Sequence, residues 1–175
     1  MTPTVTVAQL ERTISRYLRE KRSPLAPYTT DIVTAGLAQG VHPVLLVAIA
    51  QAETQCATDP AAGLDITVRH NAWGYGPHLA FPTWEAAVEV IAADLRRNYL
   101  NRGLRTVVQI RDRYAPLGAA NDPQGLNPGW AKNVRTIMAA LGADPDGPVG
   151  PARVPWQTRT WLTRRYPWLP RARPA

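Results

Sequence analysis

The chain has 175 residues, 45% of them hydrophobic, which suits one globular domain with extensions. No apolar run approaches the roughly 20 residues that span a bilayer, and the single cysteine excludes an intramolecular disulfide framework. The net charge of +7 lies in the flanks: residues 1–27 carry +3, residues 143–175 carry +4, and residues 28–142 are neutral. Because a nucleic-acid-binding domain needs a basic face, we expect no nucleic-acid partner.

The N-terminal part of the chain is predicted to form two helices. Residues 7–21 carry apolar side chains at helical spacing with charges between them, which predicts an amphipathic helix that docks on the main domain. A stiff link with two prolines follows at residues 23–27. A second helix is expected over residues 29–39, where Thr29 or Thr30 can cap it. We see no basic segment followed by an apolar one, and so expect no secretory signal.

Residues 43–54 are predicted to form a buried helix, because they are apolar on almost every side. Pro43 fits its first turn. Glu53 is the single formally charged side chain between residues 32 and 58, and it lies at the C-terminal end of this helix. Burial and the helix dipole both disfavour a carboxylate there, so we expect a raised pKa, as a general acid needs. A Glu that simply reaches solvent is the competing interpretation.

Residues 55–81 lack helical periodicity and predict a loop-rich lobe, with a short β-hairpin around residues 65–68 as an option. Helices are expected again from Trp84 to about Leu100, from Thr106 through Tyr114, and from Asn127 to Gly142, each with a capping residue at its start. The fold class is therefore all-α, with two non-helical segments that could flank a cleft. Cys56 is interpreted as a small buried hydrophobe.

The last part of the chain, residues 143–175, differs in composition from the rest. It contains seven prolines, six arginines and three tryptophans. We expect an extended linker from Pro145 to Pro155 and a short basic amphipathic helix from Trp156 to Tyr166. Such a tail can bind an anionic membrane or wall polymer. Alternatively, Trp156 or Trp161 packs back on the domain.

Four motifs in this order resemble the lysozyme-like peptidoglycan hydrolases of the glucosaminidase type, found among bacterial autolysins, flagellar muramidases and phage lysins. They are GVHPVLLVAIAQAET at residues 40–54, NAWG at 71–74, FPTWEAA at 81–87, and Tyr114-Ala115-Pro116 followed by Asn121-Asp122 and Trp130. The resemblance covers residues 28–142, which we take as the catalytic domain between an N-terminal helix and linker (1–27) and the tail (143–175). It implies a lysozyme-like helical fold that binds an amino-sugar polymer between two lobes.

The resemblance also assigns roles to individual residues. Glu53 matches the catalytic acid, and Tyr114 matches a tyrosine that lines the cleft and assists at the scissile sugar. Asn71 and Trp73 match a turn that shapes the cleft and supports the Glu. Trp73 and Tyr75 lie in a loop and could either stack on sugar rings or pack in the core, so Asn71, Trp73 and Tyr75 are the candidate substrate-binding residues.

A second carboxylate is harder to place. Asp59, Asp65 and Asp122 are candidates, although each could be a plain turn residue. Without a second carboxylate, the substrate's own N-acetyl group could assist, or the enzyme could be a lytic transglycosylase. The three histidines, His42, His70 and His78, lack metal-ligand spacing, so we expect no metal and no cofactor.

The leading hypothesis is therefore a monomeric enzyme that cuts the glycan strands of bacterial peptidoglycan. A muramidase or lytic transglycosylase on the same substrate is the nearest alternative. From another class, an inactive wall-binding or structural phage component keeps the same shape. Peptidoglycan lies outside the membrane, so synthesis in the cytoplasm without a signal peptide implies pore-assisted release, as for a phage lysin, or delivery in a phage particle.

Overall fold

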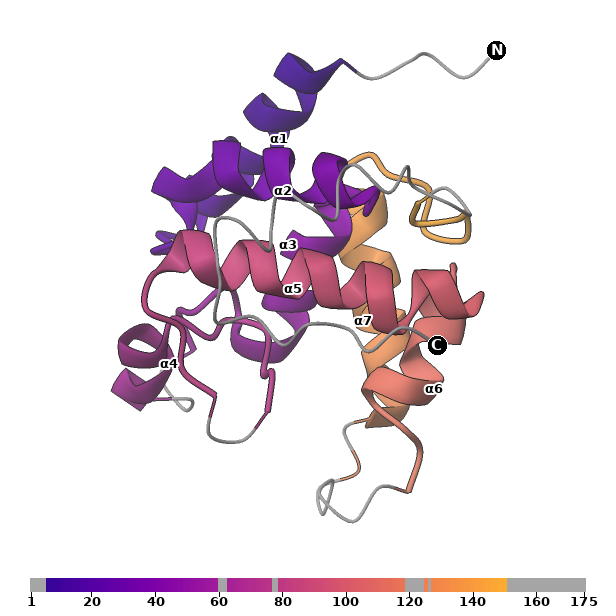
Figure 1. The fold of residues 1–175 in the computed structure, drawn as a ribbon. Helices are drawn as coiled ribbons and strands as arrows, with labels where there is room; N and C mark the ends of the chain where they lie inside the picture. The colour runs from indigo at the N-terminus through magenta and orange to yellow at the C-terminus, as the bar shows by residue number, and fades with distance from the viewer. Residues whose placement is uncertain (1–5, 60–62, 77–78, 119–124, 126, 151–175) are drawn as a thin grey trace.

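The computed structural model describes residues 6–59, 63–76, 79–118, 125 and 127–150. Within these ranges the chain forms seven α-helices and two short 3-10 helices, and no strand (Figure 1). The α-helices are α1 (Val7–Glu20), α2 (Thr29–Gln39), α3 (Pro43–Thr54), α4 (Gly63–Arg69), α5 (Trp84–Asn98), α6 (Val107–Tyr114) and α7 (Asn127–Ala140), and the 3-10 helices are η1 (Ala26–Tyr28) and η3 (Leu100–Arg102). The predicted all-α class is confirmed.

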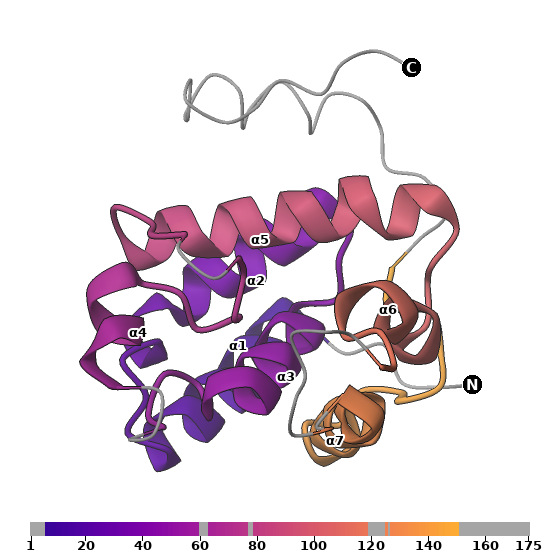
Figure 2. The same cartoon turned by 90° about the horizontal axis from the view of Figure 1, so that it is seen from below.

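The helices are arranged around α3. Helix α2 packs against α5 on one side of it, and α7 packs directly on α3. Helix α1 lies against α2, and α6 lies against α7. In the view from below, α4 lies at one end of the molecule and the α6–α7 pair lies at the other (Figure 2). The site residues expected on α3 and α6 are therefore brought together by α7, which contacts both of these helices.

Helix α3 is buried as its sequence predicts. Every residue from Pro43 to Ala50 is buried, and Leu45, Leu46 and Ile49 are 0% exposed. Burying each such side chain contributes roughly 1.5–3 kcal/mol relative to leaving it in water. The helix is thus held in the core along most of its length, and only its last turn, where Glu53 lies, approaches the surface.

The start of α3 has an unusual cap. The Nδ1 atom of His42 accepts a hydrogen bond from the backbone N–H of Val44 at 3.2 Å. Helices start with backbone N–H groups that have no partner inside the helix, and a side-chain acceptor at this position satisfies one of them. Burial lowers the pKa of His42, which keeps Nδ1 free to accept.

The option of a β-hairpin around residues 65–68 is wrong, because these residues belong to α4. The run Ile66-Thr67-Val68 is rich in β-branched side chains and therefore resembles a strand. A strand needs a partner for its backbone hydrogen bonds, whereas a helix satisfies them within the segment. The described chain offers no strand to pair with, and the loop-rich part of the lobe is limited to the residues on either side of α4.

The two flanks pack on the domain to different extents. Helix α1 buries Ile14 and Leu18, as predicted for a docked amphipathic helix. After α7, Val149 is 1% exposed; its N–H donates to the carbonyl of Arg105 at 2.8 Å, and its carbonyl accepts from the N–H of His42 at 2.7 Å. The packed chain therefore continues to Gly150, into the expected linker. Residues 151–175, including the expected basic helix, lie outside the described residues.

No single helix in the described part of the chain is both long and apolar enough to cross a bilayer. The segments Ala26–Gln39 and Pro43–Thr54 reach the length and hydropathy of a membrane span only when taken together, and they are bent by 119° relative to each other.

Candidate functional site

The site is built on Glu53, in the last turn of α3. Its Oε1 atom accepts a hydrogen bond of 2.6 Å from the indole N–H of Trp130 on α7. Burial raises the pKa of Glu53, and the Trp130 hydrogen bond opposes this rise by favouring the ionised form. Burial is the larger effect, so the carboxyl keeps its proton to a higher pH than an ordinary Glu.

The chain makes a tight left-handed turn directly after α3. Gln55, Cys56 and Ala57 have φ values of 53°, 60° and 63°, a conformation that costs a non-glycine residue roughly 1–2 kcal/mol. The hydroxyl of Thr54 stabilises the turn by accepting from the N–H of Ala57 at 2.9 Å, and it donates to the carbonyl of Ala72 at 2.8 Å. The end of α3 is thereby fixed to the following loop. Cys56 is buried, as predicted.

The loop of residues 71–76 is closed by Asn71. Its side-chain amide donates to the carbonyls of Tyr75 (2.9 Å) and Leu79 (3.1 Å), and its oxygen accepts from the N–H of Tyr75 at 3.0 Å. Asn71 is only 8% exposed, so these contacts use the side chain inside the protein. Asn71 therefore supports the loop. Its burial argues against a direct contact with substrate.

Gly74 brings this loop against Glu53. Its φ of +58° is in the left-handed region, and a Cβ atom added at this position would lie 2.7 Å from Oε2 of Glu53. Glycine is thus required twice, once for the backbone conformation and once for the close approach. With Trp130 at Oε1 and Gly74 beside Oε2, both oxygens of the carboxyl have fixed surroundings.

Trp73 does not bind substrate through its ring. The side chain is 0% exposed, and its indole N–H donates to the carbonyl of Leu46 on α3 at 2.9 Å. The sequence left open whether this ring stacks on a sugar or packs in the core, and the structure shows packing. The substrate-binding role predicted for Trp73 is therefore corrected. The physical reason is that a large apolar ring gains most from full burial when its N–H finds an acceptor there.

Tyr114, at the end of α6, joins the same group. Its hydroxyl donates to the carbonyl of Trp73 at 2.6 Å, and its ring stacks on Trp130 with centroids 5.0 Å apart and planes inclined by 24°. Burial, followed by the negative charge of Glu53, raises the pKa of Tyr114, so its hydroxyl stays a neutral donor. Glu53, Trp130, Tyr114 and Trp73 are therefore linked through two hydrogen bonds and one ring contact.

Tyr75 lies next to α5. It is partly buried, and its hydroxyl is hydrogen-bonded to the carboxylate of Asp94; burial, followed by this hydrogen bond, raises the pKa of Tyr75. Asp94 also accepts from Asn98 and pairs with Arg97 at 3.2 Å. The Tyr75 hydroxyl is therefore already engaged by protein.

The sequence did not identify the roles of Trp130 and Gly74. Trp130 was named only as part of the fourth motif, with no role assigned to it, and it is just 6% exposed. A buried indole still needs an acceptor for its N–H, and a buried Glu needs a donor. These complementary needs were the feature of the sequence that could have predicted the contact. Trp130 and Glu53 are 77 positions apart in the chain, however, so no local pattern pairs them.

The candidates for a second carboxylate are only partly described. Asp59 is partly buried after the left-handed turn, where its N–H donates to the carbonyl of Thr54 at 3.1 Å. Asp65 belongs to α4, but its side chain is outside the described part of the structure, and Asp122 is outside it altogether. The two causes that shift the pKa of Glu53 are burial and Trp130, and neither is a second carboxylate.

The arrangement suits proton donation: a half-buried carboxyl with a raised pKa, one oxygen held by an indole and the other against a glycine. No protein-family model and no curated protein matches this sequence.

Proposed function

We propose that this protein is a glycoside hydrolase that cuts the glycan strands of bacterial peptidoglycan, with Glu53 as the general acid. The observation that supports it most is the state of Glu53, whose burial raises its pKa while Trp130 and Gly74 fix its position. Glycosidases need a carboxylic acid that still holds its proton near neutral pH. The choice of peptidoglycan rests on the four sequence motifs, and the place of action would accordingly be the cell wall.

In this mechanism Glu53 donates its proton to the glycosidic oxygen as the bond to the anomeric carbon breaks. The departing sugar leaves with a hydroxyl group, and Glu53 is left as a carboxylate. The Trp130 N–H, 2.6 Å from Oε1, then stabilises the new negative charge. A water molecule completes the hydrolysis: its oxygen bonds to the anomeric carbon, and one of its protons goes to the Glu53 carboxylate, which restores the acid. Tyr114 assists indirectly, because its ring stacks on Trp130 and its hydroxyl is bonded to Trp73.

A lytic transglycosylase reaction on the same strands is the second candidate. It needs a single carboxyl, and it is favoured by the way the two oxygens of Glu53 are held, one by the indole N–H of Trp130 and the other beside Gly74. In this reaction Glu53 first donates its proton and then, as a carboxylate, takes one from the substrate hydroxyl that closes the anhydro ring. No water is consumed, and the product carries an anhydro-sugar end.

The test compares purified wild-type protein and Glu53→Gln on peptidoglycan, with the released fragments identified by mass spectrometry. General acid catalysis contributes about 10²–10⁴-fold, so Glu53→Gln should release at least about 100-fold less. Glu20→Gln, at the exposed end of α1, is the matched control and should behave as wild type.

The fragments decide between the two reactions. Reducing ends that depend on Glu53 indicate hydrolysis, and their sugar separates a glucosaminidase from a muramidase. Anhydro ends indicate the transglycosylase. Equal release by wild type and Glu53→Gln, or no release from several wall types, would contradict both and favour a wall-binding protein without activity.

A further inference from the structure

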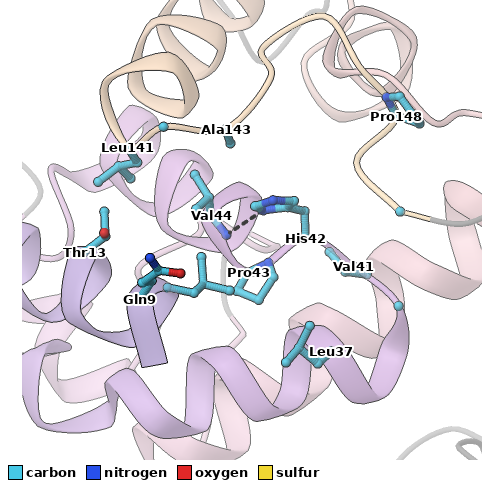
Figure 3. Close-up of a pocket in the computed structure, with 14 residues that line it drawn as sticks. Gln9, Thr13, Leu37, Val41, His42, Pro43, Val44, Leu141, Ala143 and Pro148 are labelled. Atoms are coloured by element: carbon cyan, nitrogen blue, oxygen red, sulfur yellow. Dashed lines mark hydrogen bonds between the residues drawn. The ribbon is translucent and has the colours of Figure 1, made fainter. Parts of the chain in front are cut away.

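A second feature of the molecule lies away from Glu53, at the N-terminal end of α3. A cavity of about 870 Å³ opens there between α1, α2, α3 and the chain that follows α7 (Figure 3). This volume is in the range of about 300–1,000 Å³ that ligand pockets usually have. Leu37, Val41, Pro43, Ala143 and Gly150 are among the residues that line it, and no lining residue carries a formal charge at neutral pH.

The cavity leaves apolar surface uncovered within the described part of the chain. Leu37 on α2 is 49% exposed although it lines the cavity together with Val41 and Pro43 (Figure 3). Helix α3 has 12 residues and is therefore about 18 Å long. An occupant of the cavity would thus be separated from Glu53 by most of the length of the core helix.

The last described residue of the chain, Gly150, lies at this cavity. Gly150 is one of the lining residues, and the preceding residue, Val149, is held by backbone hydrogen bonds to His42 and Arg105. Residues 151–175 follow directly and contain three of the six tryptophans of the protein. Trp156 is six residues beyond Gly150, so an extended chain could carry it roughly 20 Å, enough to return over the opening.

Charge also favours this segment over other occupants. Residues 151–175 contain six arginines and no acidic residue. Asp144 and Asp146 are exposed in the segment that closes one side of the cavity; Asp146 already pairs with Arg135, and Asp144 directly follows the lining residue Ala143. The tail can therefore place tryptophans in the uncharged cavity while its arginines stay near these carboxylates.

We propose that residues 155–162 of the tail dock in this cavity of the same chain, with Trp156 and Trp161 covering Leu37 and the start of α3. Each aromatic side chain can bury about 150–250 Å². The attachment at Gly150 makes the association intramolecular, which gives an effective concentration in the millimolar range for a short linker. The tail then acts as an internal clamp on the entry to the core helix.

The test is a mutant cycle in the full-length protein, with Tm as the readout. Leu37→Lys and the pair Trp156→Ala/Trp161→Ala should each lower Tm by about 2–6 °C. Their combination should lower it no further than the larger single effect, because both remove the same contact. Val108→Lys is the matched control: Val108 is 45% exposed on α6 and does not line the cavity, so its effect should add to that of the tail variant.

Three results would overturn the proposal. Strict additivity of Leu37→Lys with the tail variant would show that the two do not touch. If light scattering showed a dimer, and the coupling between the two variants disappeared at dilutions where the dimer dissociates, the tail of one copy would lie in the cavity of another. A coupling of Leu37→Lys with deletion of residues 1–5, and none with the tail variant, would make the N-terminus the occupant.

Discussion

At the scale of single residues, the protonation of Glu53 is set by two opposing effects, burial and the Trp130 hydrogen bond. In the proposed function Glu53 acts while protonated, so activity should fall as the pH rises through its pKa. Trp130→Phe removes the donor that favours the carboxylate and should raise this pKa. We therefore expect the alkaline limb of the pH–rate profile to move to higher pH, with a lower maximal rate because the new carboxylate is less stabilised.

The measurement is fragment release over a pH series for wild type and Trp130→Phe. Trp84→Phe is the control, since Trp84 is equally buried at 6% exposure but contacts His70 instead of Glu53. An alkaline limb that stays in place in Trp130→Phe, or moves to lower pH, would contradict the assigned role of the indole.

Gly74 gives a second prediction at this scale. Gly74→Ala should lose most activity, because the new Cβ would lie 2.7 Å from Oε2 of Glu53 and displace the carboxyl. Gly142→Ala is the matched control: its φ of +77° imposes a similar backbone strain of about 1–2 kcal/mol, but no atom lies within 4 Å of the added Cβ. Stability by urea unfolding and fragment release should both be measured. Equal activity of the two variants would show that Gly74 serves only the turn.

At the scale of secondary-structure elements, the cap of α3 depends on the protonation of His42. Its Nδ1 can accept from Val44 only when it carries no proton. Burial lowers the pKa of His42 below its ordinary value of 6.5. The stabilising contribution is therefore complete above about pH 6.5 and is lost as the pH falls towards the lower folded-state pKa.

His42→Asn tests this dependence, because Asn caps a helix without titrating. Wild type should lose up to about 1 kcal/mol more unfolding free energy than His42→Asn between pH 7 and pH 5. The measurement is urea unfolding at both pH values, and every other titrating group is common to the two proteins. Parallel losses would show that the cap does not depend on the charge of His42.

At the scale of the whole molecule, Arg96 joins distant parts of the fold. It lies on α5, is only 5% exposed, and donates through Nε to the carbonyl of Gln39 at 2.7 Å and through Nη2 to that of Gly40. It thus satisfies carbonyls at the C-terminal end of α2, where the helix dipole favours a cation. The α2–α5 contact and the start of the connection to α3 both depend on it.

Arg96→Met should lower the free energy of unfolding by about 1–3 kcal/mol, because it removes the donor of the buried Gln39 carbonyl and of the partly buried Gly40 carbonyl. Arg97→Met is the control. Arg97 has a side chain that is 41% exposed, and its ion pair with Asp94 should contribute only about 0.2–1 kcal/mol. Urea unfolding of both variants checks the difference. Equal losses would show that the α2–α5 contact rests on apolar packing alone.

Much of the fold could be read from local patterns. The bounds of α2 and α3 agree with those expected from Thr29 and Pro43, and Thr83 and Thr106 cap α5 and α6 through their side chains as expected. Two local predictions are wrong. No side chain caps α2, because its N-cap residue is Tyr28 and the hydroxyl of Thr29 donates to the carbonyl of Ala26 instead. Residues 65–68, where a β-branched run indicated a strand, belong to α4. Helix ends are set by short-range hydrogen bonds, and the residues that form them are neighbours in the sequence. The choice between strand and helix depends on whether a pairing partner exists, which no local pattern reveals.

The sequence alone determined that Glu53 is an isolated acid at the end of a buried helix, because burial follows from the apolar residues on either side of it. Only the tertiary structure decided what surrounds its carboxyl: the indole of Trp130, the backbone of Gly74, and Trp73 in the core instead of at the surface. The physical reason is that these contacts arise where α3, α7 and the loop after α4 meet. Their geometry depends on how helices far apart in the chain pack, and composition and periodicity carry no record of it.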